Sequence, residues 1–266
     1  MTLRPKKSLG QHFLIDPNIR AKILDAAELS SEDCVVEIGP GKGFLTEELI
    51  KRAGRVVAIE VDRGWYDLLG KRFADASQLQ LVHADALDYR YDLLPRGYKI
   101  VSNLPYNLST PILFRLLEER TRIRRMVLMI QREVAERLVS PPGSRRFGAL
   151  SVSVQFVCET RLAFSVSPNS FRPRPKVSSS VVVLIPRTDP AVQVRDEQFF
   201  LHLVRRIFLH RRKSLKNALL MAGTPQAALK EALLESGIDP ARRPETLSLL
   251  EFARLSDRLF EKTRGL

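Results

Sequence analysis

The segment Cys34-Val35-Val36-Glu37-Ile38-Gly39-Pro40-Gly41-Lys42-Gly43 sets the architecture expected of this 266-residue chain. Its first five residues are mostly apolar and β-branched, which predicts a buried strand. The glycines predict a tight turn, and residues 44–53 then show the apolar spacing of a helix. Strand, glycine turn and helix in this order are typical of an α/β sheet that binds a nucleotide-type ligand, because glycine lets the backbone approach the ligand closely.

Three further predicted strands end in polar side chains. The runs 55–61, 79–84 and 99–102 are apolar, and they end in or are followed by Glu60, Asp85 and Asn103. Glu60 lies 21 residues after Gly39, the separation at which an acid commonly binds ribose hydroxyls. Because the carboxyl ends of parallel strands meet at one edge of an open α/β sheet, we expect these side chains around one ligand.

The glycine turn distinguishes three classes of cofactor. A phosphate-binding P-loop is excluded, because Val36 stands where its first glycine is needed and Gly43 where Ser or Thr is needed. The G-x-G-x-G spacing departs from the G-x-G-x-x-G of dinucleotide sites, which weakens NAD without excluding it. S-adenosylmethionine has no pyrophosphate, and its cationic sulfonium and amino-acid tail favour acids near the turn. Glu37, Glu60 and Asp85 supply such acids.

The four residues Asn103-Leu104-Pro105-Tyr106 suit the methylation of an exocyclic amine on a nucleic-acid base. The lone pair of such an amine is delocalised into the ring, so a site must localise and aim it. The Asn103 side-chain oxygen can accept one N–H and the Leu104 carbonyl the other, since a residue before proline is confined to extended geometry. Tyr106 can stack on the base. An ordinary strand exit with a proline turn would give the same four residues.

Taken together, the motifs resemble the ribosomal RNA adenine N6-methyltransferase superfamily, and within it the dimethyladenosine transferase (KsgA-like) family of adenine N6,N6-dimethyltransferases. The resemblance covers essentially the whole chain. The start Ser8-Leu9-Gly10-Gln11 and residues 211–217 favour this family over the antibiotic-resistance 23S methyltransferases, which share the cofactor motifs. In chain order the motifs are Lys7-Ser8-Leu9-Gly10-Gln11-His12-Phe13-Leu14, residues 37–43, residues 103–107, Phe171-Arg172-Pro173-Arg174-Pro175-Lys176-Val177-Ser178 and Arg211-Arg212-Lys213-Ser214-Leu215-Lys216-Asn217.

This resemblance implies a Rossmann-like sheet dependent on S-adenosylmethionine, followed by a small all-helical domain. It implies dimethylation of two adjacent adenines near the 3′ end of small-subunit (16S) ribosomal RNA, on naked RNA or a pre-30S subunit. Phe171 would oppose Tyr106 across a flipped base, which makes residues 103–106 and Phe171 the expected catalytic set. The expected cofactor contacts are His12, Leu14, Gly39, Gly41, Glu60, Asp85 and Asn103.

Composition is consistent with a polyanionic partner. The net charge is +13 and the pI about 10.1. The two cysteines, Cys34 and Cys158, fall in predicted strands and form no C-x-x-C pair, as expected in a reducing cytosol. The four histidines lack ligand spacing, so no metal is expected. No apolar run reaches membrane-spanning length, and we expect a soluble, cytoplasmic monomer.

A change of composition divides the chain. Residues 177–185 predict the last strand of the sheet, and Pro186-Arg187-Thr188-Asp189-Pro190 predicts a linker. Helical spacing follows at 197–209, 214–221, 225–236 and 246–260. We therefore expect a methyltransferase domain over 1–187 and a helical RNA-binding domain over 188–266.

Basic residues form three clusters. The first is Arg4, Lys6 and Lys7, and the second is 120–125 with Arg145 and Arg146, for which an ordinary solvated surface is an equal alternative. The third, over 205–216, holds six cations and no acid. Its predicted RNA contacts are Arg205, Arg206, Arg211, Arg212, Lys213 and Lys216.

Two other functions are consistent with this fold. A non-catalytic RNA-binding or assembly factor would show damage at Asn103, Tyr106 or residues 37–43, and none is present. A DNA adenine methyltransferase would carry the related Asn/Asp-Pro-Pro-Tyr motif, whereas Leu104 at the second position favours RNA.

Overall fold

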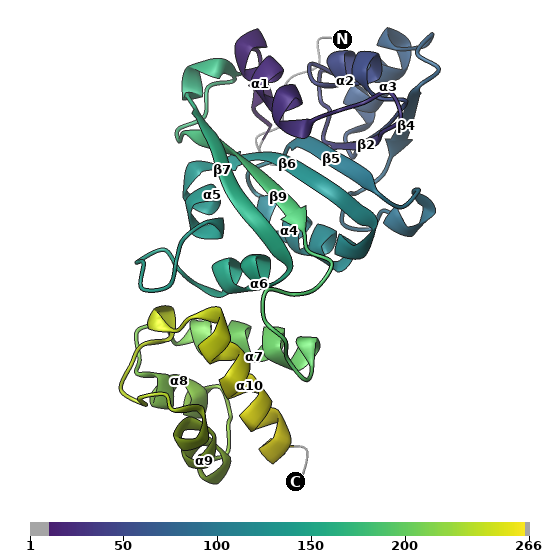
Figure 1. The fold of residues 1–266 in the computed structure, drawn as a ribbon. Helices are drawn as coiled ribbons and strands as arrows, with labels where there is room; N and C mark the ends of the chain where they lie inside the picture. Colours follow the sequence, from purple (N-terminus) through teal and green to yellow (C-terminus); the bar gives the residue numbers. More distant parts are fainter. Residues whose placement is uncertain (1–10, 264–266) are drawn as a thin grey trace. The chain divides into compact units, whose positions relative to one another are not determined.

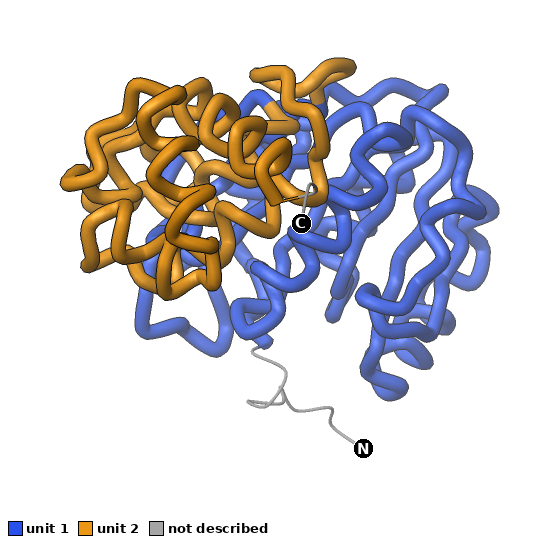
Figure 2. The backbone as a smooth tube through the Cα atoms, turned by 90° about the horizontal axis from the view of Figure 1, so that it is seen from below, with its two compact units in different colours: residues 1–135, 159–186 blue, residues 136–158, 187–266 orange. Residues whose placement is uncertain are grey.

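The computed structural model describes residues 11–263. They form two compact units (Figure 2). One unit comprises the chain up to Ala135 together with Glu159–Pro186, and the other comprises Glu136–Cys158 and the chain from Arg187 onward.

The first unit is an α/β domain (Figure 1). Its helices are α1 (Pro17–Ala27), α2 (Thr46–Arg52), α3 (Arg63–Arg72) and α4 (Ser109–Glu118), and α5 (Arg132–Leu138) leads into the second unit. The strands are β1 (Phe13–Leu14), β2 (Cys34–Ile38), β3 (Arg55–Glu60), β4 (Leu79–His83), β5 (Tyr98–Asn103), β6 (Ile123–Gln131), β7 (Cys158–Val166), β8 (Phe171–Arg172) and β9 (Ser179–Pro186).

The main sheet has seven strands in the order β4-β3-β2-β5-β6-β9-β7. Strands β2 to β6 pair in parallel, and β9 pairs antiparallel with β6. The chain runs outward from β2 to β3 and β4, and then returns to place β5 on the other side of β2. The carboxyl ends of β2 and β5 therefore flank a topological switch point, where open α/β sheets bind ligands.

The central parallel strands β2, β3 and β5 are buried because helices cover the sheet. Val35 is paired with Val56 and Val101 with Val127 across neighbouring strands, and all four share one apolar core. The helices α1 and α2 complete it with Ile23, Leu24 and Leu49. Strands buried on both faces are rich in β-branched residues, which explains why β2, β3 and β5 were predictable from composition.

Helix ends are fixed by local chemistry. The Asp16 carboxylate caps α1, with Pro17 at its first position, and the Asp62 carboxylate caps α3 by accepting from the backbone N–H of Gly64 and Trp65. In the second unit the side chains of Asp196 and Ser214 cap α7 and α8. At each of these helix starts, the side chain of the capping residue accepts a hydrogen bond from a backbone N–H that has no partner within the helix.

The second unit is helical: α6 (Ala149–Val157), α7 (Glu197–Leu209), α8 (Leu215–Met221), α9 (Gln226–Ser236) and α10 (Leu249–Thr263). Aromatic rings join three of these helices: Phe156 of α6 lies 4.5 Å from Phe200 of α7, and Phe208 of α7 lies 5.8 Å from Phe252 of α10, centroid to centroid. Glu251 near the start of α10 pairs with Arg242, which holds the Glu251 pKa at about 2.

The expected α/β sheet with a helical C-terminal part is confirmed, and the two compact units divide the chain differently from the two predicted domains. The junction at Pro186 falls one residue from the expected end of the first domain. Residues 136–158, expected in that domain, belong to the second unit, because α6 packs against α7. A single boundary in the sequence could not show that residues 136–158 belong to the second unit, since the chain then returns to the sheet in β7.

Candidate active site

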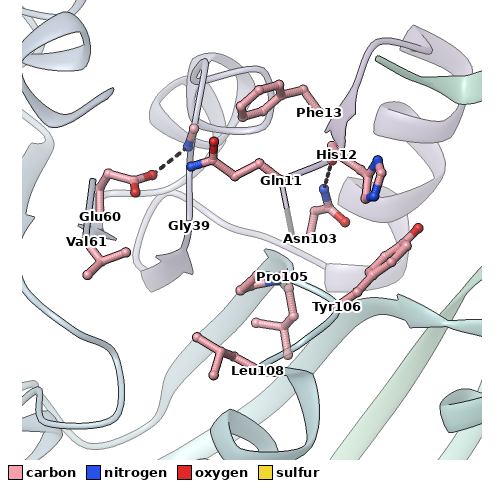
Figure 3. A pocket seen from close by; sticks show the side chains of 12 residues that line it. Gln11, His12, Phe13, Gly39, Glu60, Val61, Asn103, Pro105, Tyr106 and Leu108 are labelled. Atoms are coloured by element: carbon pink, nitrogen blue, oxygen red, sulfur yellow. Dashed lines mark hydrogen bonds between the residues drawn. The ribbon is translucent and has the colours of Figure 1, made fainter. Parts of the chain in front are cut away.

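A pocket lies at the carboxyl ends of β2, β3 and β5 (Figure 3). It encloses about 70 Å³. Of the expected site residues it collects His12, Gly39, Gly41, Glu60 and the 103–106 motif. The full lining is Gln11, His12, Phe13, Gly39, Gly41, Glu60, Val61, Asn103, Leu104, Pro105, Tyr106 and Leu108.

Two properties of the turn after β2 favour glycine, namely its backbone angles and the close approach of a neighbouring side chain. Gly39 and Gly41 have φ angles of +67° and +54°, in the left-handed region. A Cβ on Gly41 would lie 2.5 Å from Cε1 of Phe13. The turn is therefore covered closely by the Phe13 ring, which itself packs edge-on against Trp65 at 5.0 Å.

Glu60 is buried at the end of β3 and braces the turn. One carboxylate oxygen accepts from the Gly41 N–H at 3.0 Å, and the other accepts from the Asp62 N–H at 2.9 Å. Burial raises the pKa of Glu60 above its ordinary value, and these backbone N–H groups oppose the rise. The carboxylate is placed where a ligand in the pocket can compete for it.

The Asn103 amide has a fixed orientation. Its Nδ2 donates to the His12 carbonyl at 3.0 Å, as Figure 3 shows. A carbonyl partner requires the nitrogen on that side, which settles which end of the amide is oxygen. Oδ1 is buried and accepts no hydrogen bond within the described residues. A buried acceptor without a donor is costly, so this atom is well suited to receive a ligand N–H.

Tyr106 lies next to Asn103 and is held at both ends. Its ring centroid is 5.2 Å from that of His12, with 35° between the planes (Figure 3). Its hydroxyl is hydrogen-bonded to the hydroxyl of Ser179. The His12 ring is in turn fixed, because Nδ1 is 2.8 Å from the Pro173 carbonyl oxygen. Half-buried and fixed in this way, Tyr106 presents a ring beside the Asn103 oxygen.

Three expected site residues lie outside the lining of the pocket. Leu14 is buried in the core in β1, and Asp85 accepts from the Leu87 N–H at 2.9 Å in a turn after β4. The third is Phe171, whose position opposite Tyr106 across a base stays a prediction. Phe171 is fully buried in the core, because β8 pairs with β1 and its side chain points inward while Arg172 points outward.

Two residues that hold side chains of the pocket lining in place were not recognised in the sequence. Ser179 lies one residue beyond the motif that ends at Ser178, and a lone serine at the start of a strand carries no chemical signal. Trp65 donates from Nε1 to Gln11 Oε1 at 3.3 Å, which ties the segment 11–13 to α3. Contacts between residues far apart in the sequence produce no periodic pattern from which they could be predicted.

All six residues of the third basic cluster are exposed in the second unit. Arg211 also donates to the Arg145 carbonyl at 2.8 Å. The second cluster contains structural contacts, since Arg125 pairs with Glu28 at 2.7 Å and Arg146 with Glu136 at 2.9 Å. The first cluster, Arg4, Lys6 and Lys7, lies outside the described residues.

Over residues 11–263 no helix is both long and apolar enough to cross a membrane. Within the same range, no group of three or more His, Cys, Asp and Glu side chains is placed to hold a metal ion.

Comparisons with known proteins show the family to which this chain belongs. The model of the family "Ribosomal RNA adenine dimethylase" matches residues 2–261. The chain is 48% identical to the ribosomal RNA small subunit methyltransferase A of Moorella thermoacetica, over 96% of this chain and 92% of that one. It is 47% identical to the protein of the same name from Pelotomaculum thermopropionicum, over 96% and 91%.

Solved structures show the same fold at full length. A dimethyladenosine transferase from Plasmodium falciparum superposes with a TM-score of 0.79 at 26% identity, covering 96% of this chain and 99% of that one. The 23S rRNA methyltransferase ErmE superposes with a TM-score of 0.72, also at 26% identity, covering 93% and 99%. With its α/β sheet, its glycine turn and the amide of Asn103 at the strand ends, the chain belongs to the ribosomal RNA adenine dimethylase family of enzymes.

Proposed function

We propose that this enzyme transfers methyl groups from S-adenosylmethionine to N6 of adenines in small-subunit ribosomal RNA, two to each of two adjacent adenines near its 3′ end. Family membership supports the dimethylation of adenine, and the names of the relatives support the small subunit. The observation that carries the chemistry is that Asn103 lines the pocket while its buried Oδ1 accepts no hydrogen bond among the described residues.

The residues around the glycine turn suit the methyl donor. Gly39 and Gly41 line the pocket with a turn whose positive φ angles favour glycine, and Glu60 offers carboxylate oxygens for ribose hydroxyls. When bound, S-adenosylmethionine supplies an electrophilic methyl group on a cationic sulfur. Asp85 stays a predicted contact to its adenine amine, at the end of the neighbouring strand.

Entry of a ligand of this size requires a movement. Pockets for drug-sized ligands enclose roughly 300 to 1,000 Å³, whereas the one described here encloses about 70 Å³. The side chains of Gln11 and Phe13 line it above the turn and are held there by Trp65. The segment 11–13 therefore has to shift for a nucleoside to bind, and it would close over the ligand afterwards.

The target amine would be held by two acceptors. Asn103 Oδ1 accepts one N–H and the Leu104 carbonyl accepts the other, which localises the nitrogen lone pair and aims it out of the plane of the base. Tyr106 stacks on the flipped adenine. Orientation lowers the barrier, so no side chain of the site has to remove a proton before the methyl group is transferred.

A single-turnover assay tests this function. Small-subunit RNA lacking adenine dimethylation is mixed with enzyme and methyl donor, and mono- and dimethyladenine are measured by mass spectrometry. Wild type should dimethylate two adjacent adenines, and Asn103→Ala should be slower by about 100-fold or more with RNA affinity nearly kept, because orientation is lost while phosphate contacts remain. Absence of dimethyladenine with both naked RNA and subunits would refute the proposal.

A further inference from the structure

We propose that Ser179 is a positioning residue for the adenine site, acting through the hydroxyl of Tyr106 to fix the angle at which the Tyr106 ring meets the base. This inference rests on the proposed function, because it assigns a role within that same site. The two hydroxyls are hydrogen-bonded to each other, and Ser179 is fully buried.

Sheet register makes Ser179 a rigid anchor. Asn103 of β5 is paired with Met129 of β6, and Met129 is paired with Val181 of β9. Ser179 lies two residues before Val181 and is paired with Gln131. The acceptor that holds the amine and the hydroxyl that holds Tyr106 are thus carried by strands of one hydrogen-bonded sheet.

Tyr106 itself has less support from the backbone. It lies between the end of β5 and the start of α4, in a segment outside the sheet. Its ring is bounded by the His12 ring on one side, and its hydroxyl is held by Ser179. Without the Ser179 hydroxyl the ring would gain rotational freedom, and a stacked base would no longer present its amine steadily to Asn103. Stacking depends on ring orientation, so the cost should fall on catalysis.

The neighbouring residue supplies a matched control. Ser180 is on the same strand and equally buried, and its Oγ forms no hydrogen bond within the described residues. Successive side chains of a strand point to opposite faces, so Ser180→Ala removes the same atom without touching Tyr106. The pair Ser179→Ala and Ser180→Ala therefore separates the hydrogen bond from the loss of a buried hydroxyl.

The test is a double-mutant cycle of Ser179→Ala and Tyr106→Phe in the single-turnover assay on under-methylated small-subunit RNA. Each single variant should slow methyl transfer by about 2- to 10-fold, the range expected for one net hydrogen bond. The double variant should be no slower than either, because both remove the same bond. Cofactor affinity, RNA affinity and melting temperature should match those of Ser180→Ala.

The outcomes separate this inference from the proposed function. Additive losses, or a Ser180→Ala variant as slow as Ser179→Ala, would overturn the positioning role. If Ser179→Ala fails to fold, Tyr106→Phe decides alone, and a wild-type rate in that variant would also overturn it. A wild-type enzyme that leaves the RNA unmethylated would instead refute the proposed function, before any variant is compared.

Discussion

At the scale of single residues, the site is built from groups that each serve two partners. Glu60 braces the glycine turn through the Gly41 N–H and is also exposed to the pocket. Asn103 uses Nδ2 to hold the segment that contains His12, which leaves Oδ1 for a ligand. The same side chain thus shapes the pocket and offers the functional atom, so a substitution has to be interpreted against both roles.

Glu60 gives a prediction at this scale. Glu60→Ala should weaken binding of S-adenosylmethionine by about 1.5 to 3 kcal/mol, the scale of hydrogen bonds to a charged group. Glu60→Gln keeps one acceptor and should lose less. Isothermal titration calorimetry measures both, with melting temperatures to show that the turn is intact. Unchanged affinity in both Glu60→Ala and Asp85→Ala would contradict the assignment of the strand-end acids to the cofactor.

At the scale of elements, the end of β2 carries a buried acid that the pocket does not expose. Glu37 accepts from the Thr46 hydroxyl of α2 at 2.6 Å. Burial, with a smaller contribution from the charge of Glu60, raises the pKa of Glu37 to about 8. The folded protein therefore holds this proton more tightly than the unfolded chain, and the stability contributed by neutral Glu37 is lost as pH rises toward about 8.

Glu37→Gln should remove that pH dependence, because an amide can still accept from Thr46 but does not titrate. From about pH 5 to about pH 8, the free energy of unfolding of wild type should fall relative to the variant by at most about 1.4 kcal/mol per pH unit, the limit for one proton. Urea unfolding at several pH values measures it, with the exposed Glu32→Gln as control. Parallel curves for wild type and Glu37→Gln would contradict the raised pKa.

The elements also show what a sequence can predict. The strand over 34–38 and the helix over 197–209 were predicted to the residue, because continuous β-branched runs and helical spacing are local signals. The strand β6 was missed, since its start lies inside the arginine-rich run 120–125. The burial of Phe171 was not predictable from the sequence, because pairing of β8 with the distant β1 decides which way its side chain points. The contact of Ser179 with the site was not predicted either, because its hydrogen-bond partner Tyr106 is 73 residues away in the sequence.

At the scale of the whole molecule, the basic residues behind the net charge of +13 differ in whether nearby acids pair with them. Arg125 and Arg146 form ion pairs within their own unit, and such residues contribute little to attraction of a polyanion at close range. The exposed cations of the run 205–216 are the remaining dense group, with no acid among them. The side chains proposed to contact phosphates therefore belong to the helical unit, while the pocket belongs to the α/β unit.

Removing positive charges from the run 205–216 tests whether the phosphate contacts belong to the helical unit. A triple variant, Arg211→Gln, Arg212→Gln and Lys213→Gln, should flatten the dependence of log affinity for small-subunit RNA on log salt by roughly two to three units, at about 0.7 to 0.9 for each phosphate contact. The matched control neutralises Lys51, Arg52 and Arg90, which pair with Glu48, Asp25 and Asp92 in the α/β unit. It removes the same charge and should leave the slope near that of wild type. Equal slopes for both triple variants would assign the run 205–216 to an ordinary solvated surface, and phosphate binding would then have to be sought elsewhere on the chain.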